Sequence, residues 1–437
     1  MQCVDSQYWK RIGFVCFICF LIVLLILDPF HITTATDKAS SDILNRLNAL
    51  TYSSAGQEEI TVVLIDDAYL NQQSSHWPLP YAQQSKIFRQ ILQHQPKSLF
   101  IDFLYTHDRS DDADPIQPLY NVFERYKDRV PIFVPAPNQS EFSSFDLFKH
   151  VTPVKVQWHG QEHYYPLQAS DLPTPASALY DAYCESADQK CKPIDKNAAP
   201  ISVQWGAKLA KLQSQITNNE HCQQIDNFFT MSLKVVLSEV FWKLGPSWRQ
   251  NCPFSVSLMA QHLGASEADD QALLKRAIEG KTVLVGALIQ GARDEVYSPV
   301  HGLIAGVYLH AMAMDNLITY GSDYFRPPPE LIGNIDLGDF TDCLFFILVF
   351  LWRDRVASVV KKDGVVTQDK LKKVMWLAVG LLLTLLLTVV VFSYVLNYQP
   401  INWVAQLILI FTILSIQVRV FAPFRKAIQF LKKHIHK

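Results

Sequence analysis

Long runs of apolar residues lie near both ends of the chain. Residues 12–27 (IGFVCFICFLIVLLIL), 374–396 and 401–418 contain no charged side chain. A helix needs about 20 mostly apolar residues to cross the ~30 Å hydrocarbon core of a bilayer. Surface helices of soluble proteins instead carry a polar face beside the apolar one. The pattern therefore predicts membrane-spanning helices at about 12–29, 374–396 and 401–420.

A fourth apolar run, residues 343–352, is too short to cross a bilayer on its own. The distribution of basic residues decides how we interpret it. Residues 353–373, the N-terminal segment 1–11 and the tail 421–437 are all rich in Lys and Arg. The positive-inside rule places these segments in the cytoplasm, which requires an even number of crossings between them. We therefore predict a fourth span at about 333–352, with both termini in the cytoplasm.

Two of these membrane segments leave alternatives open. Asp336, Asp339 and Asp342 lie at the outer end of the fourth span, where they either face the headgroups or mark a proton or ion path. The first run has the basic start of a signal peptide, but no clear cleavage site comes after it. We expect an uncleaved anchor.

Residues 30–330 then form one large extracytoplasmic domain. Its four cysteines are an even number in a compartment that permits disulfides. Proximity in the sequence favours the pairs Cys184–Cys191 and Cys222–Cys252. Zinc is the alternative, although no ligand spacing typical of zinc is present.

Apolar runs alternate with helical patterns within this domain. We expect strands at 60–66 (ITVVLID), 98–104, 130–134 and 281–288, with a further strand at 201–205. Helices are expected at 81–93, 115–127, 268–279 and 306–319. Strands separated by helices predict an α/β fold with a mainly parallel sheet covered by helices on both faces. The stretch 136–260 is irregular, which indicates an insertion or subdomain.

Several carboxylates fall where parallel strands end, which is where such sheets bind ligands. Asp66 ends the first strand, and Asp102 lies inside or at the end of the second. Asp294 lies in the loop after the last strand, and His310 is on the next helix. We predict that these four residues converge on one side of the sheet as ligand-binding candidates, and that at least Asp66 and Asp102 line one crevice. The alternative is that the carboxylates satisfy local backbone amides and that His310 is a packed core residue.

No motif points to catalysis, a cofactor or a metal. G-x-S-x-G, P-loop and H-E-x-x-H patterns are all missing from the sequence, so we expect no enzyme activity and no cofactor. The acidic run 108–114 lacks the EF-hand spacing for calcium. We expect it to be a solvated loop with Asp114 as a helix N-cap.

The chain resembles the type-two CHASE family (cyclases/histidine kinases associated sensory extracellular). The resemblance is carried by an apolar strand ending in Ile-Asp, a Trp-Pro-x-Pro turn, a second strand with an Asp before an acidic loop, and a Gly-rich C-terminal signature. In this sequence these are 60–67, 77–81, 99–104, 108–114, 280–286, Asp294, Ser298, Pro299, Gly302, 306–311, Asp315 and Asn316. The resemblance implies an extracellular sensory module that is usually joined to a cytoplasmic kinase or cyclase.

The resemblance and the composition together define the function that we expect. The 437 residues are only 18% charged with a formal net charge of −2, which argues against a nucleic-acid partner. Residues 421–437 are too few for an output domain. We therefore expect a multi-pass protein of the bacterial inner membrane that contacts lipid. It should bind an unknown small molecule outside the cytoplasm and signal to a separate partner. A homo-oligomer is one option for its assembly. A structural subunit of an envelope complex is the alternative, and an ectoenzyme or transporter is the third.

Overall fold

The computed structural model describes residues 16, 19–20, 22–23, 26–29, 31–137, 146–156, 164–186, 191–216, 252–292, 294–333, 335–361 and 368–417. The chain divides into two compact units. Unit 2 is Asn45–Pro327, and unit 1 combines Met1–Leu44 with Pro328–Lys437.

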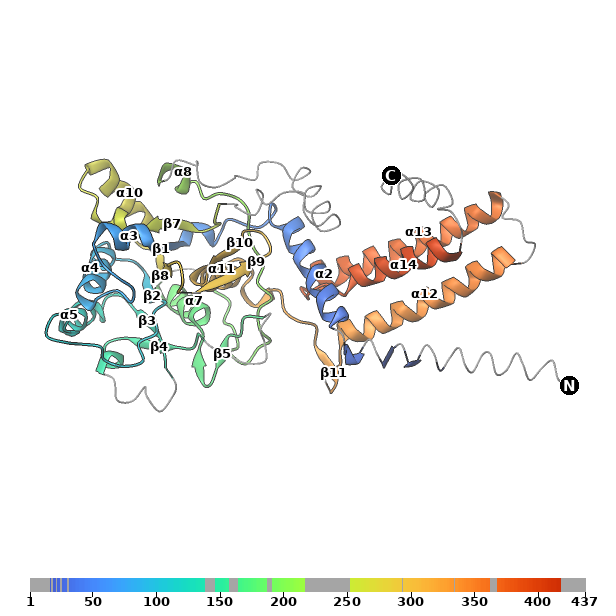
Figure 1. The fold of residues 1–437 in the computed structure, drawn as a ribbon, viewed down its shortest axis with the longest axis horizontal. Coiled ribbons are helices and arrows are strands. Elements are labelled where there is room, and N and C mark those ends of the chain that lie inside the picture. Colours follow the sequence, from blue (N-terminus) through green and yellow to red (C-terminus); the bar gives the residue numbers. More distant parts are fainter. Residues whose placement is uncertain are drawn as a thin grey trace, which may run out of the picture. The chain divides into compact units, whose positions relative to one another are not determined.

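Unit 2 is built on a six-stranded sheet in the order β4-β3-β2-β8-β1-β7 (Figure 1). All five strand pairs in it are parallel. The strands are β1 Ile60–Asp66, β2 Ser98–Ile101, β3 Ile132–Pro135, β4 Thr152–Val154, β7 Val256–Met259 and β8 Thr282–Leu288. The predicted parallel α/β fold is confirmed.

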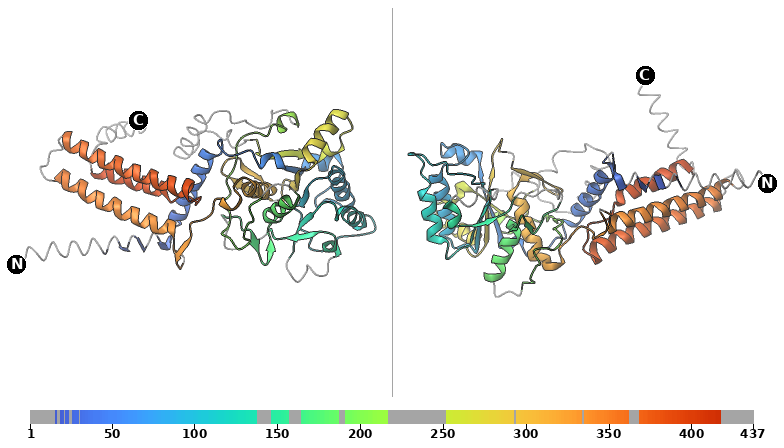
Figure 2. Two further views of the ribbon diagram at one scale, coloured as in Figure 1. Left: turned by 180° about the vertical axis from the view of Figure 1, so that it is seen from behind. Right: turned by 90° about the horizontal axis from the view of Figure 1, so that it is seen from below.

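Helices cover both faces of the sheet (Figure 2). On one face, apolar side chains of the central strands such as Val63, Ile101 and Val285 pack with those of the covering helices into one buried core. The helices of that core are α3 Asp67–Gln72, α4 Tyr81–Leu92, α5 Gln117–Tyr126 and α10 Ala268–Ile278. The other face is covered by α7 Pro175–Ser186 and α11 Val307–Tyr320.

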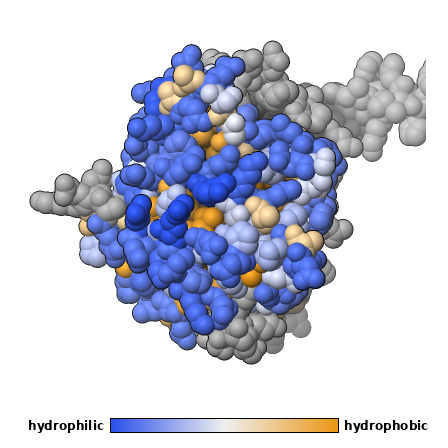
Figure 3. Space-filling model, turned by 90° about the vertical axis from the view of Figure 1, so that its left-hand side faces the viewer, coloured by the Kyte–Doolittle hydropathy of each residue, from blue (hydrophilic) through white to orange (hydrophobic). Residues whose placement is uncertain are grey.

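The side of unit 2 at the left of Figure 1 is mostly hydrophilic. Apolar residues show only in small areas between hydrophilic ones (Figure 3). The helix α4 contributes to the pattern, because Ile87 and Ile91 are fully buried while Lys86 and Arg89 face outward. This distribution suits a surface in contact with water.

Glycine at position 286 lets α11 lie close to the sheet. A Cβ there would come within 2.5 Å of the Val307 side chain. The ring of Phe100 in β2 meets the ring of His310 edge to face, with centroids 5.3 Å apart. These contacts bring α11 directly over β8 and β2.

The structure departs from the sequence-based expectations in the irregular stretch. Residues 201–205 form only an isolated bridge, between Ile201 and Tyr165. Side chains take the amide hydrogens that a sheet partner would need, since Asn316 accepts from Gln204 and Asn45 accepts from Trp205. The predicted strand is therefore wrong. The edge strands β4 and β7 and the helix α7 lie in the same stretch.

Smaller elements complete the described chain. They are the helix α2 Ile32–Asn48, the helix α8 Gln213–Ile216, the two-stranded pairs β5 Gln168–Ala169 with β6 Leu172–Pro173 and β9 Glu295–Ser298 with β10 Gly302–Ala305, and 3-10 turns at Gln57–Glu59, Asp146–Lys149, Ala260–Gly264 and Gly321–Asp323.

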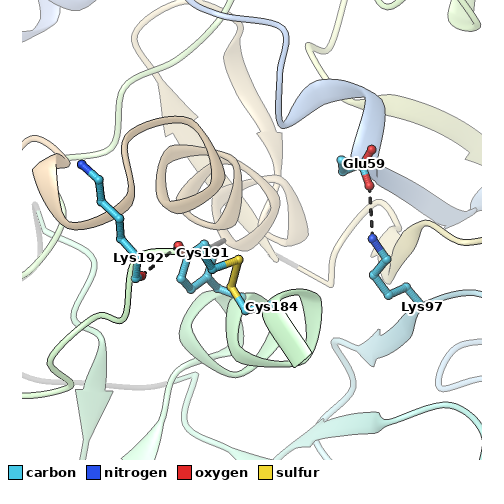
Figure 4. The surroundings of a disulfide bond; sticks show 6 residues. Glu59, Lys97, Cys184, Cys191 and Lys192 are labelled. Carbon is cyan, nitrogen blue, oxygen red and sulfur yellow. Dashed lines mark hydrogen bonds and ion pairs between the residues drawn. A yellow bond between two sulfur atoms is a disulfide. The ribbon is translucent and has the colours of Figure 1, made fainter. Parts of the chain in front are cut away.

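A disulfide closes the end of α7. Cys184 and Cys191 are bonded, with their Cα atoms 5.6 Å apart, as predicted (Figure 4). Beside them, the hydroxyl of Tyr180 donates to the carbonyl of Lys192 at 3.1 Å. Cys252 is also disulfide-bonded, and its predicted partner Cys222 lies outside the described residues.

The described part of unit 1 contains three helices rich in apolar residues and one small hairpin. The helices are α12 Leu337–Lys361, α13 Gln368–Val390, which continues into a π-helical turn at Val391–Val395, and α14 Trp403–Gln417; the hairpin joins β11 Glu330–Ile332 to β12 Ile335–Asp336. Within the described residues, one helical stretch, Met375–Val395, is long and apolar enough to cross a membrane, and Trp403–Thr412 is a shorter apolar helix.

The segment predicted as the basic loop 353–373 is partly helical. α12 continues through it to Lys361, and α13 starts at Gln368. Half of the predicted first span lies outside the described residues. The rest of that span includes exposed apolar side chains at Phe20 and Val23.

Candidate functional site

Asp102 lies at the carboxyl end of β2, directly after the last paired residue. Its amide donates to the carbonyl of Val285 at 2.8 Å, which fixes the backbone against β8. The side chain is 11% exposed. Burial raises the pKa of Asp102 well above its ordinary value, and the negative charge of Asp294 raises it further. Within the described part of the chain, its carboxyl has no hydrogen-bond partner.

His310 of α11 faces this carboxyl from the neighbouring layer. Its Nε2 lies 3.8 Å from Oδ2 of Asp102, which is too long for a hydrogen bond. Burial lowers the pKa of His310 to about 3, so the ring is neutral at pH 7 and the contact is not an ion pair. A hydrogen bond to the other ring nitrogen, Nδ1, therefore fixes the position of His310.

Tyr165 holds that nitrogen. Its hydroxyl lies 2.8 Å from Nδ1 of His310 and accepts a hydrogen bond from the amide of Ala176 at 3.0 Å. That amide is in the first turn of α7. Hydrogen bonds therefore connect the N-terminal end of α7 to Tyr165, and Tyr165 to His310. A tyrosine that already accepts from Ala176 favours donating its own proton to Nδ1, which leaves the ring proton on Nε2, toward Asp102.

Asp294 approaches the start of α11 because Gly306 leaves room for it. A Cβ on Gly306 would come within 2.4 Å of Oδ1 of Asp294. The Gly306 amide donates to the carbonyl oxygen of Asp294 at 2.9 Å, so the backbone is fixed as well. Asp294 is an exposed residue, in contrast to Asp102.

A cavity of about 600 Å³ opens beside Asp102 and Asp294, and we call it the Asp102 cavity. Its volume is within the range of ligand pockets. Asp102, Asp294 and Arg109 supply charged groups, and apolar side chains form much of the remaining wall. The apolar and aromatic members include Trp77, Leu79, Phe103, Tyr105 and Ala287.

Asp66 and Asp67 lie beside a second cavity of about 470 Å³, the Asp66 cavity. The Asp66 carboxylate accepts from the amide of Tyr69 at 2.8 Å and is the N-cap of α3. The Asp67 carboxylate accepts from the amide of Gln290 at 2.9 Å. Both carboxylates thus accept from backbone amides, Asp66 from its own helix and Asp67 from the loop after β8. Asp294 lines both cavities, and Asp102 lines only the first.

The four predicted site residues are therefore placed unevenly. Asp102 and Asp294 line one cavity, and His310 approaches Asp102 without lining that cavity. Asp66 lines the other cavity and has the local capping role that was the alternative. Ligand binding by any of them stays a prediction. Tyr165, which positions His310, was missed because a single tyrosine in an irregular stretch carries no pattern.

Carboxylates of the acidic run 108–114 accept hydrogen bonds from backbone amides of the same run. Asp111 accepts from the amide of Asp114, and Asp108 accepts from the amide of Ser110. Asp114 caps a helix, but that helix is α4, since its carboxylate accepts from the amides of Tyr81 and Ala82. The run is exposed except at Asp114, as expected for a solvated loop. No group of three potential ligands placed to hold a metal occurs among the described residues.

Comparison with known proteins identifies one family. The model of the CHASE2 domain matches residues 16–351 of the chain. No curated protein and no solved structure matches it.

Proposed function

The chain belongs to the CHASE2 domain family of extracellular sensory domains, and from this premise we propose that it is a membrane sensor. In this proposal, unit 2 binds a small molecule outside the cytoplasm and a separate signalling partner receives the signal. The observation that carries it is the Asp102 cavity, where a carboxyl that is only 11% exposed faces open space without a hydrogen-bond donor from the described residues. A carboxyl largely withdrawn from water gains from a hydrogen-bonding partner, and a ligand is one way to supply that partner.

Exposed apolar side chains support the membrane part of the proposal. They occur along all three long helices of unit 1, at Leu348 and Leu351 in α12, Trp376 and Leu387 in α13 and Phe411 in α14. Water would not favour so many exposed large apolar groups, whereas lipid would. We propose four spans at about 12–29, 333–352, 374–396 and 401–420, with unit 2 outside the cytoplasm.

A thermal-shift experiment on the purified full-length protein in detergent tests the sensing role. Amino acids, amines, carboxylic acids, sugars and nucleosides would be added one at a time. We expect at least one compound to raise the melting temperature with saturation. The variant Ala292→Trp, which fills the rim of the Asp102 cavity, should abolish the shift, and Ala292→Ser should keep it.

A structural subunit of an envelope complex remains the second candidate. Tyr297 and Leu303 are directly opposite each other on the β9–β10 pair and are 44% and 64% exposed. Such a pair suits contact with another protein. If no compound shifts the melting temperature and an envelope protein co-purifies in fixed stoichiometry, this second function replaces the first.

A further inference from the structure

The Asp102 cavity has a chemical character that narrows its ligand. Asp102 lies at one side of it with a side chain that is 11% exposed. Its pKa is raised by removal from water and further by the charge of Asp294, which lines the same space. Two carboxyl groups that repel each other are each stabilised by a cation placed between them.

No basic side chain in the described part of the chain supplies that cation. Arg109 lines the cavity, but its guanidinium lies over the ring of Tyr81, 5.3 Å from the centroid. His310 is neutral at pH 7 because burial lowers its pKa to about 3. His107 also lines the cavity, and its Nδ1 is 2.9 Å from the hydroxyl of Thr106. Among the described residues, no group therefore places a cation between the two carboxyl groups, which leaves the ligand as its source.

The walls distinguish an organic cation from a metal ion. Hard metal ions take six or more oxygen ligands, and no group of three suitable side chains is placed to hold a metal among the described residues. The rings of Trp77 and Phe103 lie edge to face, with centroids 5.3 Å apart, on the wall of the same cavity. Aromatic rings attract ammonium groups and cover apolar ligand surface.

We propose that the Asp102 cavity binds a small molecule with a protonated amine at one end and an apolar body at the other. The ammonium lies between the carboxylates of Asp102 and Asp294, and the body packs on Trp77 and Phe103. This inference rests on the proposed sensing function and specifies the ligand class.

Matched probes test the proposal by calorimetric titration of the full-length protein in detergent. The probes are 2-phenylethylamine, its neutral counterpart 2-phenylethanol, and magnesium chloride. We expect saturable binding of the amine, and binding at least about tenfold weaker for the alcohol, because the alcohol lacks the charge-assisted hydrogen bonds. Asp102→Asn and Asp294→Asn should each weaken the binding of the amine by at least about tenfold. Asp181→Asn removes a partly exposed charge from α7 and should leave the affinity for the amine unchanged.

The other outcomes overturn the amine proposal in distinguishable ways. Equal binding of alcohol and amine, both weakened by Ala292→Trp, would refute the charge argument while leaving a sensor in place. Magnesium binding that depends on Asp102, without amine binding, would make the site a metal site. If none of the three probes binds, the proposed ligand class is wrong, and the broader thermal-shift screen then decides whether the sensing function fails too.

Discussion

Gly306 controls the position of Asp294 without being strained itself. Its φ of −55° is ordinary for any residue, so Gly306→Ala should fold. The new Cβ would meet Oδ1 of Asp294 at 2.4 Å and push the carboxylate away. We expect amine affinity to fall by about tenfold or more, with a small change in melting temperature. Gly264→Ala is the control, because a Cβ there meets only the Gln90 side chain, at 3.9 Å. Equal affinities in both variants would contradict the role of Gly306.

Asp315 is a second buried acid, in a part of unit 2 that does not line the cavities. Its Oδ1 accepts from the hydroxyl of Tyr52 at 2.7 Å and from Thr319 at 3.2 Å. Burial raises its pKa to about 7. The folded state then binds a proton more tightly than the unfolded chain, whose Asp has a pKa near 3.9. This group's contribution to the free energy of unfolding is present below pH 4 and is lost as pH rises toward 7.

Asp315→Asn should therefore remove a pH dependence. The groups facing Asp315 are Tyr52, whose pKa is raised well above 10 by burial, and the uncharged Thr319 and Asn316, so none of them titrates in this window. We expect wild-type stability, measured by urea unfolding, to decrease relative to the variant between pH 4 and pH 7. Parallel curves for the two proteins over that range would show that Asp315 is ionised throughout.

The two predicted disulfides should differ in their effect on stability. The Cys184–Cys191 loop has a sequence separation of 7. The chain-entropy relation gives about 2.5 kcal/mol for a loop of that size and about 3.6 kcal/mol for a loop closed between 222 and 252. Cys191→Ser should therefore lower the free energy of unfolding less than Cys252→Ser. Cys252 is also 3% exposed, so a buried serine hydroxyl adds to its cost. The comparison is made by denaturant unfolding, with reduced wild type as the common control.

The elements that the sequence predicted well are those with a continuous local signal. The strand 60–66 is seven consecutive residues of β1, and the last strand 281–288 differs from β8 by one residue. β4 and β7 were missed because three- and four-residue edge strands carry too little periodicity. The false strand at 201–205 is apolar at both ends, but Asn316 and Asn45 take its amides, and no local pattern reveals that distant competition.

The candidate site, like the fold, has features that the sequence revealed and features that depend on distant contacts. A carboxylate at a strand end was visible from the sequence, which placed Asp102 and Asp66 correctly at the carboxyl edge. The difference between them lies in the next few residues of the chain. After Asp66 a helix starts and offers the amide of Tyr69, whereas the loop after Asp102 offers it no donor. The contact of His310 with Tyr165 depends on α7, which the sequence did not reveal.

At the scale of the whole molecule, topology is the property on which the sensing proposal depends. A ligand site in unit 2 senses the outside only if that unit and the basic segment 353–373 lie on opposite sides of the membrane. The basic residues predict this arrangement through the positive-inside rule. Single cysteines introduced at positions 149 and 363 would report it, in a background where Cys3, Cys16, Cys19 and Cys343 are replaced. Lys149 is a suitable site because its side chain is 73% exposed.

A membrane-impermeant maleimide should then label the two positions in opposite preparations. In right-side-out spheroplasts we expect Lys149→Cys to be labelled and Asp363→Cys to be protected, and in inverted vesicles we expect the reverse. Detergent-solubilised membranes, in which both positions should react, are the control for intrinsic accessibility. Labelling of position 363 in spheroplasts would put the basic segment outside, against its charge. An odd number of crossings would then separate the two termini, and α12 would have to be reassigned from a membrane span to an extramembrane helix.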